Sequence, residues 1–438
     1  MSGRRMKILH YSLGFPPYRT GGLTKYCIDL MLTQNEQGFE TALLWPGRIR
    51  ILCKAVRIYE HRKWNGVGSY EIINPLPVAL DEGIADVQAY RTSTDDSSYR
   101  DFLLNYNPDV VYVHTLMGLH LEFLTICKEL DIRTVFISHD YYGVCPKVIL
   151  FRDGHPCDND HDCYDCIKCN QTAMSLKKIM VMQSLFYRIF KDTVIMKKIR
   201  RRHRKVFFEM QPPDKVQKET EDKQRSEYQK LRNYYVTMLE NMDFIHFNST
   251  VAEKIYRRYF EPKNSGVRAI RHRDIADHRK IKDFDHERVR LAYLGTARPY
   301  KGFFFLLSVL DDIWECGNRN FELSIYTATS EKRPYMISVQ ERYTYSQLEK
   351  IFDNTDLLIV PSLWYETFGF NVLEALSYGV PVLVSRNVGA KDLVSDNFIY
   401  DDLREKMLEI ISERKILAIE NQKIVSSEII KSVIGKAR

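Results

Sequence analysis

LLIVPSLWYETFGFNVLEALSYGVPVLVS, residues 357–385, is the stretch that decides the fold. It opens with an apolar run of strand length that a proline ends. Residues 371–378 then carry apolar side chains at helical spacing, and Gly379, followed shortly by another proline, is a helix stop. The run Val382–Val384 is a second apolar strand. Strand, loop, helix and strand in this order predict a parallel crossover unit.

The loop in front of this helix carries groups that suit a diphosphate. The first N–H groups of a helix have no partner within it, and they face an anion together with the positive end of the helix dipole. Glu366 precedes the helix, and Glu374 lies about 12 Å further on if the segment is helical. A carboxylate accepts two hydroxyl hydrogen bonds, so either glutamate suits sugar or ribose hydroxyls. The backbone candidates for the diphosphate are Thr367, Phe368, Gly369 and Phe370.

This stretch resembles the Glu-x7-Glu signature of the retaining glycosyltransferases of family four, the glycosyl transferases group 1. Glu366 and Glu374 stand where the signature has its two glutamates, and the flanking PS, FGF, EAL and GVPV residues are all present. The resemblance implies that Glu366 contacts the donor sugar and that Glu374 contacts the ribose. The alternative interpretation is a surface helix with two solvated glutamates.

The length of 438 residues suits two or three domains. Strands and helices alternate over 6–140 and again in the second half, which predicts an α/β protein with parallel sheets and helices on both faces. The resemblance implies the GT-B fold, in which two doubly wound, Rossmann-like domains face each other across a cleft. We expect an acceptor-side domain at 1–280 with a Cys-rich and basic helical insertion at 145–240, a nucleotide-sugar domain at 281–410, and a last helix at 411–438 that crosses back.

Two cations follow the first strand of the second half, in the run LGTARPYKGF. Arg298 and Lys301 are expected to reach the same edge of the sheet as Glu366, where they would neutralise a diphosphate leaving group. The family usually has an arginine just after the first glycine of this run and a lysine before the second. Lys301 fits that pattern, but Thr296 stands where the arginine is expected. The alternative is that both cations are surface residues.

Glycines and histidines mark strand ends in the first half. Gly21 and Gly22 lie in the first strand-to-helix loop, where they allow a phosphate to approach the backbone or simply form a turn. His114 and His139 each end a strand. The resemblance implies that His139, in the run FISHD, lies near the donor sugar, where it can bind a hydroxyl or stabilise developing charge. Asp140 equally suits a turn.

Five cysteines with the spacing C-x11-C-x5-C-x2-C-x2-C occupy a loop-like segment. Four thiolates can hold a structural Zn²⁺, and a segment with so few apolar residues needs such a clip. An iron–sulfur cluster and a set of free cytosolic thiols are the alternatives. Similar insertions occur in a subgroup of the family. The expected ligands are Cys145, Cys157, Cys163 and Cys166, with Cys169, His155 or His161 as substitutes for one of them.

The net charge of +7 comes from one segment. Residues 177–205 contain eleven Lys or Arg and one Asp, a local charge of +10, so the remainder is about −3. Apolar residues recur at helical spacing over 174–205, which predicts a basic amphipathic helix at an anionic membrane surface. Nucleic-acid binding and a helix packed on the core are the alternatives.

No apolar run reaches the roughly 18–20 residues that span a bilayer, and the N-terminal residues show no signal-peptide pattern. Nine cysteines without such a signal argue for a reducing compartment. The expected location is therefore the cytoplasm, at the inner face of the cell membrane.

Taken with the resemblance, these features imply an enzyme that moves a sugar from a nucleotide-diphospho-sugar to a saccharide or polyprenyl-linked acceptor. It would retain the anomeric configuration and serve cell-surface polysaccharide synthesis. Catalysis should need no cofactor, neither Mg²⁺ nor Mn²⁺, because this fold uses no Asp-x-Asp motif for the donor. A nucleotide-sugar 2-epimerase of the same fold is one alternative. A nucleic-acid-binding protein is another, although no nucleic-acid partner is expected.

Overall fold

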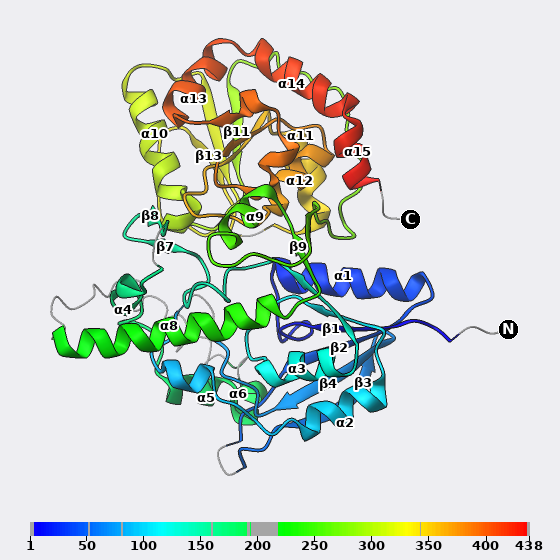
Figure 1. The fold of residues 1–438 in the computed structure, drawn as a ribbon. Coiled ribbons are helices and arrows are strands. Elements are labelled where there is room, and N and C mark those ends of the chain that lie inside the picture. The colour runs from blue at the N-terminus through cyan, green and yellow to red at the C-terminus, as the bar shows by residue number, and fades with distance from the viewer. Residues whose placement is uncertain are drawn as a thin grey trace. The chain divides into compact units, whose positions relative to one another are not determined.

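A computed structural model describes most of the chain, and its folded part divides into two compact units. Unit 1 comprises Met1–Leu150, Cys157–Phe247 and Tyr256–Gly266, and unit 2 comprises Phe151–Pro156, Asn248–Ile255 and Val267–Arg438. Each unit is described by itself below (Figure 1). The residues described are 4–50, 53–79, 82–158, 161–190, 193, 218–341 and 343–435.

Unit 1 contains one sheet built around β1. Its described strands run in the order β10-β9-β6-β5-β1-β2-β4-β3. The pairings from β9 through β4 are parallel, whereas β3 pairs antiparallel with β4. The strands are β1 (Lys7–Tyr11), β2 (Glu40–Pro46), β3 (Arg57–Trp64), β4 (Val67–Ile73), β5 (Val110–Val113), β6 (Arg133–Ile137), β9 (Phe244–Phe247) and β10 (Ser265–Val267).

The strand order of unit 1 reverses between β1 and β5. The chain adds β2 on one side of β1 and β5 on the other, so this boundary is the topological switch point where α/β sheets bind ligands. Both faces of β1 and β5 are covered, which matches their nearly continuous apolar sequence. The long helices of the unit are α1 (Gly22–Glu36), α2 (Ser97–Tyr106), α3 (Leu121–Glu129) and α8 (Lys218–Glu240).

The β3–β4 hairpin at the sheet edge has no counterpart in the sequence prediction. Asn65 and Gly66 form its turn, both with positive φ (47° and 84°). An Asn-Gly pair is the preferred sequence for a two-residue turn of this hand, because both positions require left-handed backbone. The hairpin adds an antiparallel edge to an otherwise parallel sheet.

The predicted insertion at 145–240 consists of short elements and α8. These are β7 (Phe151–Arg152), β8 (His155–Pro156), α4 (Tyr164–Cys169), α5 (Leu176–Met182) and α6 (Leu185–Phe190). The prediction of one continuous basic helix over 174–205 is wrong in its described part, because α5 and α6 are separate. The basic tail KKIRRRHRK, residues 197–205, lies outside the described residues.

Side-chain hydrogen bonds to the backbone explain the break between α5 and α6. The buried Gln183 side chain accepts from the Val78 N–H at 2.8 Å and donates to the Gly47 carbonyl at 3.4 Å. Ser184 Oγ accepts from the Tyr187 N–H at 3.2 Å and so begins α6. Polar side chains that bind the backbone in this way compete with helix continuation. Within the described ranges, we find no helix with the length and apolar character needed to cross a bilayer.

Unit 2 has a sheet in the order β13-β12-β11-β14-β15-β16 with every pairing parallel among the described strands. The strands are β11 (Val289–Tyr293), β12 (Phe321–Ile325), β13 (Met336–Val339), β14 (Leu357–Val360), β15 (Val382–Ser385) and β16 (Ile399–Tyr400). The helices are α9 (Thr250–Tyr256, whose last residue belongs to unit 1), α10 (Phe303–Glu315), α11 (Leu348–Asp353), α12 (Phe370–Ser377), α13 (Leu403–Ser412), α14 (Lys415–Ser426) and α15 (Glu428–Ile434).

Residues 267–280, which the sequence pattern places in the first domain, pack with unit 2. The His278 N–H donates to the Ser377 carbonyl at 2.8 Å, and Asn421 Nδ2 donates to the Lys280 carbonyl at 3.0 Å. These bonds hold the segment against unit 2. Because the segment has few apolar residues, its sequence does not show to which domain it belongs. The helices α14 and α15 also belong to unit 2.

The core of unit 2 reflects the two-residue repeat of its strands and the repeat of about 3.6 residues in α10. Alternate residues of β11 and β12 face α10, and the α10 residues that meet them recur every three or four positions. Figure 1 shows α10 and α13 on one side of this sheet and α12 on the other. The sheet reverses its order between β11 and β14, so the loops after these two strands meet at the switch point.

Gly302 lets the loop after β11 lie against the loop after β14. Its φ is +71°, and a Cβ atom there would lie 1.9 Å from the Pro361 carbonyl oxygen. A backbone oxygen cannot move aside as a flexible side chain can. The glycine is therefore required for the two loops to touch, in addition to its role in starting α10.

We predict that Gly302→Ala destabilises unit 2 far more than Gly317→Ala. Gly317 has φ +92°, but a Cβ atom added there would have nothing within 4 Å. The stability lost in Gly317→Ala should therefore come from the backbone conformation alone, about 1–2 kcal/mol. The Gly302 variant should lose at least about 2 kcal/mol more, because a backbone clash is added. Urea unfolding of both variants measures the difference, and equal losses would contradict the close approach.

Candidate functional site

An ion pair joins the two loops at the switch point of unit 2. Lys301 Nζ lies 2.7 Å from Glu366 Oε1 and 4.8 Å from the centre of the Trp364 ring. The Lys301 and Glu366 side chains are only 21% and 15% exposed. Lys301 ends a short turn after β11, and Glu366 follows β14. The topology thus brings together two of the residues that the sequence predicts as catalytic.

The loop that carries Glu366 is held on both sides. Ser362 Oγ donates to Glu366 Oε2 at 2.6 Å, and Ser385 Oγ donates to the Ser362 carbonyl at 2.6 Å. The Glu366 N–H donates to the Asn387 carbonyl, and the Glu366 carbonyl accepts from the Gly389 N–H, both at 2.9 Å. Each carboxylate oxygen has one protein donor and a second acceptor site, which suits it to bind hydroxyl groups.

The segment 367–370 presents its backbone at the start of α12. The Thr367 and Phe368 side chains are buried, so these residues offer main-chain groups only. Gly369 adopts φ +103°, and a Cβ atom there would lie 3.2 Å from Val388 Cγ1 and 3.7 Å from Glu366 Cδ. The glycine therefore keeps the helix entrance open beside Glu366. In the first turn of α12, the Val372 N–H donates to the Gly369 carbonyl at 3.1 Å, and the first N–H groups of a helix are the ones that can bind an anion.

Glu374 lies within α12 and is 3% exposed. Its Oε1 contacts His272 Nε2 at 3.1 Å, and its Oε2 makes no hydrogen bond in the part of the chain that the structure describes. The Tyr345 and Phe370 rings pack on the His272 ring, with centroids 4.8 and 5.2 Å away. Burial raises the pKa of Tyr343, and so do the Glu374 charge and a hydrogen-bonding interaction with the Glu374 carboxylate. Glu374 is thus a buried acceptor that lies between His272 and Tyr343.

Arg298 lies in the same loop as Lys301 and is half-buried. Its backbone N–H donates to the Thr296 carbonyl at 2.8 Å, and its carbonyl accepts from the Lys301 N–H at 3.1 Å. Thr296, at the position where the family has its arginine, is exposed. Arg298 therefore stands one tight turn before Lys301, and its role remains a prediction.

Gly21, Gly22 and His139 belong to unit 1, whereas the other predicted catalytic and donor-binding residues belong to unit 2. Gly22 is the first residue of α1, and Gly21 precedes it with open space around its Cα. The loop after β1 therefore has room for a ligand group next to the start of a long helix. The Asp140 carboxylate accepts from the Tyr142 N–H at 3.0 Å and from Thr115 Oγ1 at 3.2 Å, a turn arrangement.

His139 ends a row of three imidazoles. Its Nε2 lies 3.2 Å from His114 Nδ1, His114 Nε2 lies 2.9 Å from His10 Nδ1, and His10 Nε2 lies 2.7 Å from Gln34 Oε1. Burial lowers the pKa of His10 to about 4 and of His139 to about 3, and it lowers the pKa of His114 as well. All three rings are therefore neutral near pH 7, and each hydrogen bond needs one donor and one acceptor nitrogen.

An amide oxygen only accepts, so the Gln34 contact orients the whole row. His10 donates from Nε2, which leaves its Nδ1 to accept from His114 Nε2–H. His114 Nδ1 then accepts from His139 Nε2–H, and the proton-free nitrogen of His139 is Nδ1. The row thereby fixes which nitrogen of His139 can accept a proton or a hydrogen bond.

Three of the five cysteines of the insertion, Cys145, Cys163 and Cys166, interact with Arg232 of α8. Arg232 Nη2 donates to Cys166 Sγ at 3.6 Å, and Cys163 and Cys166 are buried. Burial raises the pKa of Cys145 to about 12, with smaller effects from Cys169 and Cys157. These thiols are therefore close enough to interact electrostatically.

The cysteines are near one another without forming a closed ligand set. Among the described residues, three metal-binding atoms come within 4.8 Å of one another only at His10, Cys27 and His114. The predicted zinc ligands Cys145, Cys157, Cys163 and Cys166 would have to move together to hold an ion.

Sequence reasoning missed three side chains that shape the unit 2 site. Ser362 and Trp364 lie inside the quoted stretch, but nothing in the pattern shows that one binds Glu366 and the other covers Lys301. His272 is 102 positions from Glu374, in a polar segment without a motif, so no sequence signal could have paired them.

Comparison with known proteins identifies a family for this geometry. Residues 274–418 match the family model described as Glycosyl transferases group 1. A relative described as an uncharacterized 41.2 kDa protein in the cps region of Klebsiella pneumoniae is 24% identical over 138 residues. That match covers 30% of this chain and 38% of the relative, so it spans well under half of either.

Solved structures match nearly the whole chain. WaaG, a glycosyltransferase involved in lipopolysaccharide biosynthesis, aligns with TM-score 0.52 and 12% identity over 98% of both chains. Anabaena Alr3699/HepE in complex with UDP and glucose gives 0.52 and 12% over 98% of this chain and 96% of that one. The trehalose 6-phosphate synthase of Burkholderia multivorans gives 0.53 and 12% over 99% and 94%. The chain thus has the GT-B fold of these proteins, and its residues 274–418 match the model of the glycosyl transferases group 1 family.

Proposed function

We propose that this protein transfers a sugar from a nucleotide-diphospho-sugar to a saccharide or polyprenyl-linked acceptor, with retention of configuration. The observation that carries the proposal is the Lys301–Glu366 pair beside the open start of α12. The match of residues 274–418 to the family model supports the reaction class. The similarity to WaaG and to a protein of a cps region supports a cell-surface polysaccharide as the product.

Different residues of unit 2 bind different parts of the donor. The first-turn amides of α12 and the Lys301 ammonium bind the diphosphate, and Arg298 adds a second cation. Glu366 accepts hydrogen bonds from the sugar hydroxyls, and the unpaired Oε2 of Glu374 accepts from the ribose. Charge builds on the diphosphate as the glycosidic bond breaks, so donors already aimed at it lower the barrier.

The remaining parts of the proposal concern the acceptor. In unit 1, the Gly21–Gly22 loop and His139 bind ligand groups, with the imidazole of His139 hydrogen-bonded to a hydroxyl. The departing diphosphate accepts the acceptor proton, so catalysis needs neither a dedicated protein base nor a divalent metal.

We predict that Lys301→Ala and Glu366→Gln each lower the transfer rate by about 100- to 1,000-fold, because each removes a group that acts on the transition state. Lys280→Ala is the matched control, since Lys280 forms an ion pair of the same length (2.7 Å) with Asp353 in the same unit. Mass spectrometry of products from a panel of UDP-, GDP- and ADP-sugars gives the rates. Full activity in both site variants would refute the site.

The same panel separates the alternatives. A 2-epimerase changes the donor without any acceptor, so donor-only incubation would reveal it. Leaving Mg²⁺ and Mn²⁺ out of the assay should leave transfer unchanged. A nucleic-acid-binding protein would instead shift RNA or DNA in a salt-dependent way.

We also propose that the insertion binds a structural Zn²⁺ through Cys145, Cys157, Cys163 and Cys166. The proximity of these thiols to one another and to Arg232 supports it, as does the small amount of regular structure between residues 145 and 169. Arg232 would lie beside an anionic zinc–thiolate centre, where its charge is favourable.

We predict that Cys163→Ser loses one equivalent of zinc and lowers the stability of unit 1, because structural zinc contributes directly to folding. Cys53→Ser, a half-buried cysteine of the same unit outside the insertion, is the control. Elemental analysis and thermal unfolding report both effects. Equal zinc contents in the two variants would contradict the proposal.

A third proposal places the protein at an anionic membrane on the cytoplasmic side. The described support is a set of exposed apolar side chains on α5 and α6, among them Val181, Phe186 (65% exposed) and Ile189 (64%). Apolar side chains next to basic residues are typical of helices that lie in the membrane interface.

We predict that Phe186→Asp combined with Ile189→Asp weakens binding to vesicles rich in phosphatidylglycerol by at least about 10-fold, because each side chain contributes roughly 1.5–3 kcal/mol when buried in an apolar phase. Ile429→Asp on α15 is the control, since that side chain is equally exposed (68%). Vesicle co-sedimentation measures binding. Unchanged binding in the double variant, or none by the wild type, would count against membrane contact.

A further inference from the structure

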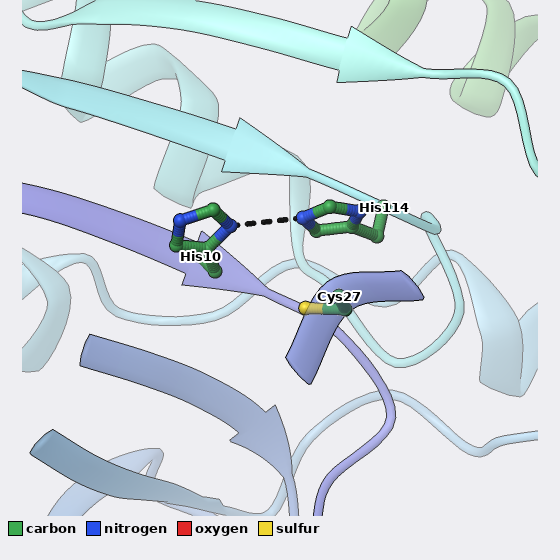
Figure 2. A group of neighbouring side chains, drawn as sticks. All are labelled: His10, Cys27 and His114. Atoms are coloured by element: carbon green, nitrogen blue, oxygen red, sulfur yellow. Dashed lines mark hydrogen bonds between the residues drawn. The ribbon is translucent and has the colours of Figure 1, made fainter. Parts of the chain in front are cut away.

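Three buried side chains at the switch point of unit 1 have the composition of a metal site. His10 is the last but one residue of β1, His114 follows β5, and Cys27 lies on α1. All three are at most 1% exposed, and their ligand atoms lie within 4.8 Å of one another. Figure 2 shows the two imidazoles meeting along their hydrogen bond, with the Cys27 sulfur beside them. We propose that His10 Nδ1, His114 Nε2 and Cys27 Sγ bind a zinc ion.

The geometry needs only small adjustments to hold the ion. Zn²⁺ binds nitrogen at about 2.0–2.1 Å and sulfur at about 2.3 Å, so tetrahedral nitrogen and sulfur ligands lie roughly 3.3–3.6 Å apart. The two nitrogens, now 2.9 Å apart, would separate by roughly half an ångström, and the sulfur would approach by about 1.2 Å at most. Side-chain rotations on three anchored elements supply movements of this size. Three protein ligands leave the fourth position open.

The surroundings orient the ligands as a metal requires. Gln34 Oε1 accepts from His10 Nε2–H at 2.7 Å, which leaves Nδ1 with a lone pair directed at the site. Metal-bound histidines nearly always make such a bond from the second nitrogen. His114 has its own outer partner in His139, at 3.2 Å. Tyr112 stacks on the His10 ring and helps to keep the site dry.

Zinc binding releases one proton from the protein. The Cys27 thiol becomes a thiolate, and its proton leaves to the solvent. The hydrogen bond between His10 and His114 breaks, and the His114 proton moves from Nε2 to Nδ1, which then donates to His139 Nε2. His139 in turn carries its proton on Nδ1. Zinc binding would therefore change the tautomer of His139.

The test is a Co²⁺ titration of metal-stripped, full-length protein, because Co²⁺ replaces Zn²⁺ and reports thiolate ligation through a charge-transfer band. Cys27→Ala is compared with Cys127→Ala, a cysteine just as buried, on α3 of the same unit. The Cys127 variant should bind one equivalent more than the Cys27 variant. The cysteines of the insertion are intact in both, so a metal there contributes equally and cancels.

Histidine variants keep the test decisive if Cys27→Ala does not fold. His114→Gln should lose the same equivalent, and His120→Gln, a buried histidine that bonds to Tyr99 instead, should keep it. Gln34→Leu should retain the stoichiometry but bind about 10- to 100-fold more weakly, as expected for an outer partner. Equal Co²⁺ stoichiometry in folded variant and control would overturn the proposal.

Discussion

The contact between Lys301 and Glu366 is the interaction on which the unit 2 site depends. In the proposed function a diphosphate binds beside Glu366, whose negative charge would by itself repel it. The lysine resolves the conflict because its ammonium has three donors. One is used by Glu366 Oε1, and the others remain for an anion. The Trp364 ring beneath the ammonium holds it in place. The same cation can thus serve the carboxylate and the phosphate together.

The two sheets place different chemistry at the same topological position. In unit 2 the switch point holds a charged pair, and in unit 1 it holds a row of neutral imidazoles. Strand order explains why both positions are available, because the helices after the two diverging strands leave a gap at their carboxyl ends. Burial explains the difference in charge. The Lys301 pair keeps partial access to solvent, whereas His10 and His114 have none and stay uncharged.

Sequence reasoning predicted best the strands that are buried on both faces of a parallel sheet. β14 begins with the apolar run that opens the stretch 357–385, and β15 ends one residue beyond the predicted strand Val382–Val384, because a continuous apolar run has little competing interpretation. The β3–β4 hairpin was missed although its Asn-Gly turn was visible, since its exposed strand lacks apolar alternation. The boundary near 280 and the break at Gln183 depend on distant hydrogen bonds, which a sequence pattern cannot show.

The structure adds the burial and the hydrogen-bond partner of Glu374 to what the sequence predicts for this residue. A buried acceptor without a partner costs about 1–3 kcal/mol, so a helix that only needed packing would carry an apolar side chain there. His272 satisfies one oxygen and, packed between Tyr345 and Phe370, cannot turn to serve the other. Tyr343, whose pKa the Glu374 carboxylate helps to raise, is the protein group near enough to interact with this carboxylate. In the proposed function, a ribose hydroxyl beside the start of α12 would give the second oxygen the hydrogen bond that it lacks among the described residues.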